Sequence, residues 1–223
     1  MSSTDTLGDD FGRALVTGIR EALVSAADAL GDLDRRAGDG DFGANVRTAM
    51  KLLDASVETD RPGTSRAWLT ALSRAWLGVG GTSGPLFGTF FRDLAKAADE
   101  DAAPTAERFA EALAAGQATI QKYGEAQVGD KTMIDALDPA VTALREALGA
   151  GRGPVEALGA AAQAAVDGAR ATAETTARRG RASYVGDAAR GVIDPGAAAM
   201  ALVLGAAHAA AGGGDAVDAD WIG

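Results

Sequence analysis

The sequence predicts an all-α protein of eight amphipathic helices, and three observations support that prediction. Apolar residues recur three or four positions apart in eight segments, which is the spacing of one face of an α-helix. No window alternates apolar and polar residues with the β-branched enrichment typical of a strand. Hydrophobic residues make up 47% of the 223 residues but aromatic residues only 5%, so alanine supplies much of the apolar content. Thin, closely packed helices are therefore expected.

Four helices are predicted in the first half of the chain. The first is expected to end near Gly31, and the second follows Gly43 and stops before the Pro62-Gly63 break. The third lies between that break and a glycine-rich turn, and the fourth follows the turn with Ser83 as its cap. Their apolar positions are, helix by helix, Phe11, Leu15, Ile19, Leu23, Ala26 and Leu30; Val46, Met50 and Leu53; Trp68, Leu72 and Trp76; and Leu86, Phe90 and Leu94.

Four more helices are predicted in the second half. Pro104 opens the fifth helix, residues 149–151 end the sixth, and Pro154 opens the seventh. The eighth, residues 196–211, is rich in alanine and carries no charge, which is typical of a helix packed on all sides in a bundle rather than of a membrane span. The apolar positions of the fifth, sixth and seventh are Phe109, Leu113, Gly116, Ile120 and Tyr123; Ile134, Leu137, Val141, Leu144 and Leu148; and Val155, Leu158, Ala162 and Val166.

Composition excludes several classes of function. The formal net charge of −10 argues against a nucleic-acid partner or an anionic membrane, because binding to phosphate surfaces favours net basic charge. The chain has no cysteine and one histidine, so thiolate and multi-histidine metal sites are excluded and any metal must bind to carboxylates. The polar, acidic N-terminal segment lacks the pattern of a targeting signal, so we expect a cytoplasmic protein.

An acidic loop is predicted between the first two helices. It carries Asp34, Asp39 and Asp41, with Gly38 and Gly40 beside the last two. Carboxylate oxygens on a glycine-rich backbone suit a hard cation such as Mg²⁺. A solvated turn with an aspartate helix cap explains the same residues.

Two further loops have features that are typical of phosphate-binding sites. The turn at residues 78–85 leads into a helix and offers backbone N–H groups and the hydroxyls of Thr82 and Ser83, which are features of a phosphate-binding turn. A flexible connector between two helices explains the same residues. Residues 124–132 come close to the GxxxxGK[ST] pattern, but Asp130 is inserted before the lysine and a helix precedes the segment where that motif needs a strand. A P-loop is therefore not expected.

A basic cluster follows the seventh helix. Arg178, Arg179 and Arg181 suit planar, bidentate contacts to phosphate, but a solvated helix end explains the same cluster and is the interpretation that the residues alone favour. His208 lies in the alanine-rich last helix, where a structural role is expected.

Four segments in chain order resemble the L subunit (DhaL type), or C-terminal nucleotide domain, of dihydroxyacetone kinases. They are Leu33-Asp34 with Gly38-Asp39-Gly40-Asp41; GGTSGPLFG at 80–88; GDKTMIDAL at 129–137; and Gly180-Arg181-Ala182-Ser183-Tyr184 with Asp194-Pro195-Gly196-Ala197. The resemblance covers nearly the whole chain, so residues 1–223 are expected to form one nucleotide-binding domain. It implies a closed barrel of eight antiparallel amphipathic helices with the nucleotide site in the loops at one end.

The resemblance also implies a site. ADP or ATP would be bound through two Mg²⁺ ions held by Asp34, Asp39 and Asp41, which are the catalytic candidates as well. The residues that it places around the nucleotide are Phe42, Gly43, Ala44, Asn45, Thr82, Ser83, Gly124, Met133, Arg181, Asp194, Pro195 and Gly196. The family usually has histidine where this chain has Phe42, and often methionine where it has Val46, so a side-chain hydrogen bond to the nucleotide is lost.

The implied function is that of a phosphoryl-donor subunit. Dihydroxyacetone would be held on a partner subunit of the DhaK type, and the bound ADP would be recharged from phosphoenolpyruvate through a phosphohistidine carrier of the DhaM type. With only His208 in this chain, both the sugar adduct and the phosphohistidine are expected on other chains. The alternatives are a subunit that exchanges ATP and phosphorylates dihydroxyacetone or a related ketose, a non-catalytic nucleotide-sensing module, and a helical scaffold with a structural cation.

Overall fold

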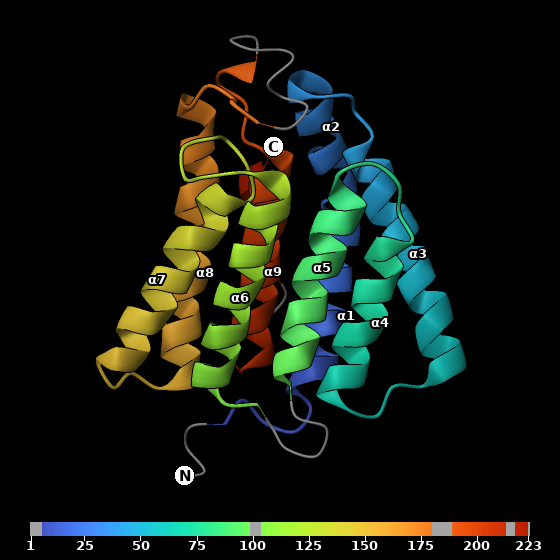
Figure 1. The fold of residues 1–223 in the computed structure, drawn as a ribbon, viewed down its shortest axis with the longest axis vertical. Coiled ribbons are helices and arrows are strands. Elements are labelled where there is room, and N and C mark those ends of the chain that lie inside the picture. Colours follow the sequence, from blue (N-terminus) through green and yellow to red (C-terminus); the bar gives the residue numbers. More distant parts are fainter. Residues whose placement is uncertain (1–5, 99–103, 180–188, 213–216, 223) are drawn as a thin grey trace.

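The computed structural model describes residues 6–98, 104–179, 189–212 and 217–222, and these residues form an all-helical structure (Figure 1). Within this part of the chain the one extended pairing is an isolated bridge between Thr6 and Thr105. The α-helices are α1 (Phe11–Ser25), α2 (Ala27–Ala37), α3 (Phe42–Asp60), α4 (Ser65–Leu77), α5 (Ser83–Ala97), α6 (Ala106–Gly124), α7 (Ile134–Gly149), α8 (Pro154–Ala171) and α9 (Pro195–Ala210). Short 3₁₀ turns follow at Thr172–Glu174 and Asp220–Ile222.

The helices form a circuit of rods that alternate in direction. Because α1 and α2 follow one another as a single bent rod, the α-helices of the described residues make eight rods (Figure 1). Each rod packs against the next along the chain, and α9 packs against α1 as well as α8, which closes the circuit. The predicted all-α class with antiparallel neighbours is confirmed, and α2, α4, α6 and α8 end at the same end of the molecule at which α3, α5, α7 and α9 begin (Figure 1).

The prediction of one helix ending near Gly31 is wrong. The chain bends at Ala26 and the helix continues to Ala37, so Leu33 and Asp34 lie on α2 rather than in a loop. Gly31 does not end the helix but lies where α2 meets α3. A Cβ added at Gly43 would lie 2.4 Å from the carbonyl oxygen of Ala27, so a side chain there would separate the two helices.

Two other local expectations are also corrected. Ser83 is the first residue of α5 rather than its cap, because the helix starts at the N-cap Thr82, whose side chain makes no capping hydrogen bond in the described structure. Tyr123 does not share the buried face of α6 and is 62% exposed. The inward face of α6 continues from the buried Ile120 to the partly buried Gly124, which lines the cavity, and Tyr123 points to solvent.

The apolar face of α8 is built from alanine more than the spacing predicts. Val155 is 39% exposed, and Ala162 and Val166 are only partly buried. The buried residues of this helix are Ala157, Leu158, Ala161, Ala165 and Ala169. Small side chains let α8 approach α7 closely, which is the thin packing that the composition predicts.

Helix α9 lies at the centre of the packing. Ten of its residues are buried, and it packs against α1, α2, α7 and α8. The expectation of a helix packed on all sides is therefore confirmed. No helix among the described residues has the length and apolar character needed to cross a membrane.

Candidate functional site

A cavity of about 480 Å³ opens at the end of the molecule where four helices begin. The first residues of α3, α5 and α9 and the N-cap residue of α7 line it, together with the ends of α2 and α6. In the described structure the N-cap residues of α3, α5 and α7 make no side-chain capping hydrogen bond. Backbone N–H groups and the positive ends of four helix dipoles therefore face one cavity, an arrangement that favours an anion.

The three aspartates of the acidic segment line the cavity. Asp34 is buried, and its Oδ2 accepts a hydrogen bond from the Phe42 N–H at 2.9 Å, which ties the end of α2 to the start of α3. Burial raises the pKa of Asp34, the Phe42 N–H opposes that shift, and the nearby Asp39 carboxyl adds to it.

These carboxylates suit a divalent cation in their chemistry. Neighbouring carboxylates repel one another unless a cation lies among them, and repulsion by Asp39 adds to the effect of burial, which is the main cause of the raised pKa of Asp34. Within the described residues, however, no three acidic or histidine side chains come together as a metal-binding group. The assignment of Asp34, Asp39 and Asp41 as Mg²⁺ ligands therefore stays a prediction.

The glycine-rich turn brings the starts of α3 and α5 together. Gly81 has φ +76°, in the left-handed region that favours glycine. A Cβ at Gly84 would lie 2.1 Å from the carbonyl oxygen of Val79, so the turn closes tightly on itself. The Asn45 side-chain amide lies 3.5 Å from the hydroxyl of Ser83, at the edge of hydrogen-bonding distance.

The loop between α6 and α7 is not a P-loop, as the sequence predicted. Lys131 is 1% exposed, and its ammonium donates to the carbonyl oxygens of Thr172 and Val192 rather than facing an open loop. Desolvation by burial lowers the pKa of Lys131, while Asp194 and nearby carboxylates oppose that shift. Lys131 thus connects this loop to both ends of the segment that joins α8 to α9.

Asp194 begins the last helix at the cavity wall. Its carboxylate accepts from the Ala197 N–H at 2.8 Å as an N-cap, and its own N–H donates to the Thr172 hydroxyl. Burial raises the pKa of Asp194 to about 7, the Ala197 N–H opposes this, Asp135 adds to it and Lys131 lowers it.

One wall of the cavity is apolar. The ring of Phe42 packs in a stack with Trp76 and Phe87, with centroids 6.4 and 6.0 Å away, and Trp76 and Phe87 are 4.5 Å apart. Phe42 and Phe87 line the cavity, and Leu86, Ile120 and Met133 extend this wall. The side chain of Phe42 therefore contributes packing at a position where it offers no hydrogen-bonding group.

The cavity contains most of the predicted site. The predicted residues that line it are Asp34, Asp39, Asp41, Phe42, Asn45, Thr82, Ser83, Gly124, Met133, Asp194, Pro195 and Gly196. Gly43 packs against α2 and Ala44 is exposed on α3, and neither lines the cavity. Arg181 lies outside the described residues.

Other lining residues were not among those that the resemblance places around the nucleotide, although the phosphate interpretations of the glycine-rich turn and of the basic cluster included Gly80, Gly81 and Arg179. They are Ala37, Gly80, Gly81, Leu86, Phe87, Ile120, Ala126, Lys131, Thr132 and Arg179. The glycine-rich turn and the GDKT segment were visible signals for Gly80, Gly81, Lys131 and Thr132. The apolar residues share the helical spacing of the core, so no sequence signal separates them from it.

Comparison with known proteins decides the family. The model of the DAK2 domain matches residues 36–209. The chain belongs to the DAK2 domain family. This DAK2 domain is 33% identical to the ADP-binding subunit DhaL of PEP-dependent dihydroxyacetone kinase 1 from Listeria innocua, over 89% of this chain and 95% of that protein. It is 35% identical to the corresponding DhaL subunit of Escherichia coli, over 82% of this chain and 88% of that protein.

Longer relatives match over part of their length. The chain is 37% identical to L-erythrulose 1-kinase of Mycolicibacterium smegmatis and spans about a third of it, 31%. The crystal structure of the dihydroxyacetone kinase of C. freundii in complex with AMP-PNP and Mg²⁺ matches with a TM-score of 0.69 and 28% identity, over 92% of this chain and 35% of that one. These findings support a nucleotide-binding kinase subunit or domain.

Proposed function

We propose that this DAK2 domain is the phosphoryl-donor subunit of a dihydroxyacetone kinase, with residues 1–223 as one nucleotide-binding domain. It would transfer phosphate from a bound nucleotide to dihydroxyacetone held on a DhaK-type partner, and a DhaM-type carrier fed from phosphoenolpyruvate would recharge the ADP. The observation that carries this proposal is the convergence of four helix N-termini on a cavity lined by aspartates. That combination suits a polyphosphate together with its cations.

In this proposal, the position of each residue in the cavity determines which part of the nucleotide or metal it would bind. The starts of α3 and α5, with Asn45, Thr82 and Ser83, would hold phosphate groups through backbone and side-chain donors, and the apolar wall would hold the base. Asp34, Asp39 and Asp41 would hold two Mg²⁺ ions, which when bound neutralise phosphate charge during transfer.

A second candidate is a kinase subunit that exchanges ADP for ATP and phosphorylates a ketose related to dihydroxyacetone. The similarity to L-erythrulose kinases favours it, because those relatives carry the same domain within a longer chain.

Binding and transfer are tested separately. Mg-ADP is expected to raise the melting temperature of the purified chain, because a ligand that binds only the folded state stabilises it. The chain is then combined with a dihydroxyacetone-binding subunit and either a phosphocarrier system with phosphoenolpyruvate or ATP alone. Dihydroxyacetone phosphate formed with the carrier system supports the first candidate, and formation with ATP alone supports the second. Binding without product in either mixture, when a known DhaL subunit gives product, would indicate a nucleotide-sensing module instead.

A further inference from the structure

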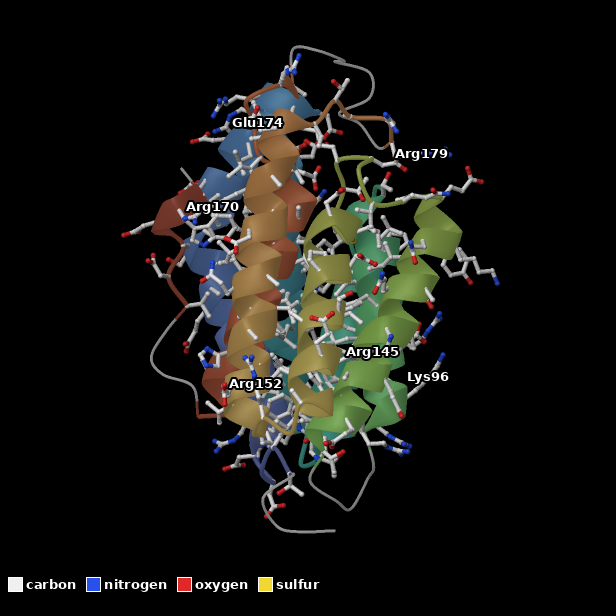
Figure 2. The ribbon with its side chains drawn as sticks, turned by 90° about the vertical axis from the view of Figure 1, so that its left-hand side faces the viewer. Lys96, Arg145, Arg152, Arg170, Glu174 and Arg179 are labelled. Atoms are coloured by element: carbon white, nitrogen blue, oxygen red, sulfur yellow. The ribbon has the colours of Figure 1, made fainter. Side chains whose placement is uncertain are left out.

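Arg179 is a cation at the rim of the cavity that the proposed nucleotide site does not use. Among the described residues that line the cavity, the cations are Lys131 and Arg179. The Lys131 ammonium donates to two backbone carbonyls, whereas the side chain of Arg179 is 47% exposed. Figure 2 places Arg179 at the cavity end of the molecule, while Lys96 and Arg152 lie toward the opposite end.

The segment that carries Arg179 is attached to the neighbouring loop. The backbone N–H of Arg178 donates to the carbonyl oxygen of Asp130 at 3.1 Å, which fixes the chain just before Arg179 beside the α6–α7 loop. The guanidinium then pairs with Glu125, with 3.2 Å between Nη1 and Oε2. Arg179 is thus held at the cavity by a positioned backbone and one carboxylate.

Glu125 occupies an unusual position for a glutamate. It is the C-cap of α6 with φ 48°, in the left-handed region that favours glycine. Its side chain is 74% exposed, so its ion pair with Arg179 is screened by water and stabilises the fold little. A phosphate inside the cavity would offer the planar guanidinium two oxygens for a bidentate contact and more negative charge.

We propose that Arg179 exchanges Glu125 for the phosphates of the nucleotide, and that Glu125 holds the guanidinium at the rim while the cavity is empty. This inference rests on the proposed nucleotide site and adds to it a phosphate-binding residue and a residue that competes with the ligand. The two side chains should then act with opposite sign. Arg179 favours binding, and Glu125 opposes it because its carboxylate must release the guanidinium first.

Calorimetric titration of Mg-ADP into the full chain tests this prediction with three variants. Arg179→Ala is expected to weaken binding about tenfold, the loss expected for one charge-assisted hydrogen bond. Glu125→Gln is expected to tighten binding about two- to threefold, because an exposed ion pair of modest strength no longer competes. The control Arg178→Ala removes the same charge from the adjacent exposed residue, which does not line the cavity, and is expected to stay within about twofold of the parent.

The pattern of the variants separates direct contact from other roles. If Arg179→Ala and Glu125→Gln both weaken binding, the ion pair is a structural connection and the proposal is overturned. Parent-like affinity for Arg179→Ala, or an equal loss for Arg178→Ala, overturns it as well. The melting temperature without ligand shows whether each variant folds, and Arg179→Gln replaces the alanine variant if that one does not. A parent chain that binds no Mg-ADP refutes the proposed function itself, which is a different result from a parent that binds and variants that do not differ.

Discussion

Lys131 is a buried cation that holds three segments of the site together. Its ammonium donates to the carbonyls of Thr172 and Val192, and its backbone has φ 63°, a left-handed conformation for a residue other than glycine. Replacing it by methionine would keep most of the side-chain volume but remove the donor to the Val192 carbonyl, whereas the Thr172 carbonyl would keep the N–H and hydroxyl of Thr175. A buried group without a partner costs about 1–3 kcal/mol, so we expect Lys131→Met to lower the free energy of unfolding by about 1–3 kcal/mol. Urea denaturation measures this, and the exposed Lys51→Met should change stability by less than about 0.5 kcal/mol. Equal effects at the two positions would show that the Lys131 contacts contribute nothing.

Asp194 gives the unliganded chain a pH dependence of its own. Its pKa is raised to about 7 in the folded state, above the value of 3.8 expected for an unfolded chain, because burial disfavours the charged carboxylate. The folded state therefore binds more protons than the unfolded state between these values, and the stability that Asp194 contributes is lost as pH rises from about 4 to about 7. Asp194→Asn keeps an oxygen that can accept from the Ala197 N–H but removes the titration. We expect the melting temperature of the parent to fall several degrees more than that of Asp194→Asn between pH 5 and pH 7.5, and the exposed Glu58→Gln to follow the parent. If the melting temperatures of the parent and of Asp194→Asn change in parallel with pH, the pKa of Asp194 is not raised in the folded state.

At the scale of the elements, close approach of two backbones positions the start of α7. A Cβ at Gly168 of α8 would lie 2.2 Å from the carbonyl oxygen of Asp135, so only glycine fits there. The Asp135 carboxylate in turn accepts the N–H groups of Gly129 and Thr132, which shapes the loop at the cavity. The close contact between α7 and α8 therefore positions Asp135, and through it the loop that lines the cavity.

The same substitution at two glycines tests that contact. Gly168→Ala should lower the free energy of unfolding by about 1–3 kcal/mol, because the added methyl overpacks backbone that cannot move aside. Gly149→Ala, at the end of α7 with open space around it, should instead raise it by up to about 1 kcal/mol through helix propensity. Stabilisation by both substitutions, measured by urea denaturation, would show that α7 and α8 can separate without loss.

Helix faces also show where spacing stops being informative. The four-three-four stripe of α6 correctly predicted Phe109, Leu113 and Ile120 as buried, yet it could not decide whether residue 123 or 124 continues the face. Gly31 has the same ambiguity, because a glycine can end a helix or let a second helix approach it. The sequence does not decide between these two roles of Gly31; the position of Gly43 against α2 in the structure does.

For the whole molecule, alternation of the rods explains why the site could be predicted better than its contacts. Residues far apart in sequence, such as Asp39, Ser83 and Asp194, meet because every second connection lies at one end of the bundle. The resemblance to dihydroxyacetone kinases placed these residues around one nucleotide, and the structure places them around one cavity. The partners of Lys131 and Arg179 could not be predicted, because each depends on how one loop lies against another rather than on local sequence.

The net charge of −10 and the aspartates of the cavity predict two distinguishable responses to salt. Any salt should screen the general repulsion and raise the melting temperature slightly. Mg²⁺ should raise it further at equal ionic strength, because a cation between Asp34 and Asp39 relieves the repulsion between them, which adds to the effect of burial on the pKa of Asp34. Removing one of the two carboxylates should cancel that excess while leaving the screening, so Asp39→Asn is expected to melt higher than the parent without Mg²⁺ and to gain no more from MgCl₂ than from NaCl. The exposed Asp60→Asn removes the same charge away from the cavity and should keep the excess, as measured by circular dichroism melts after treatment with EDTA and return of each salt. If the parent responds to MgCl₂ and NaCl alike, the carboxylates do not bind Mg²⁺ in the absence of nucleotide, and any metal must enter with the phosphates.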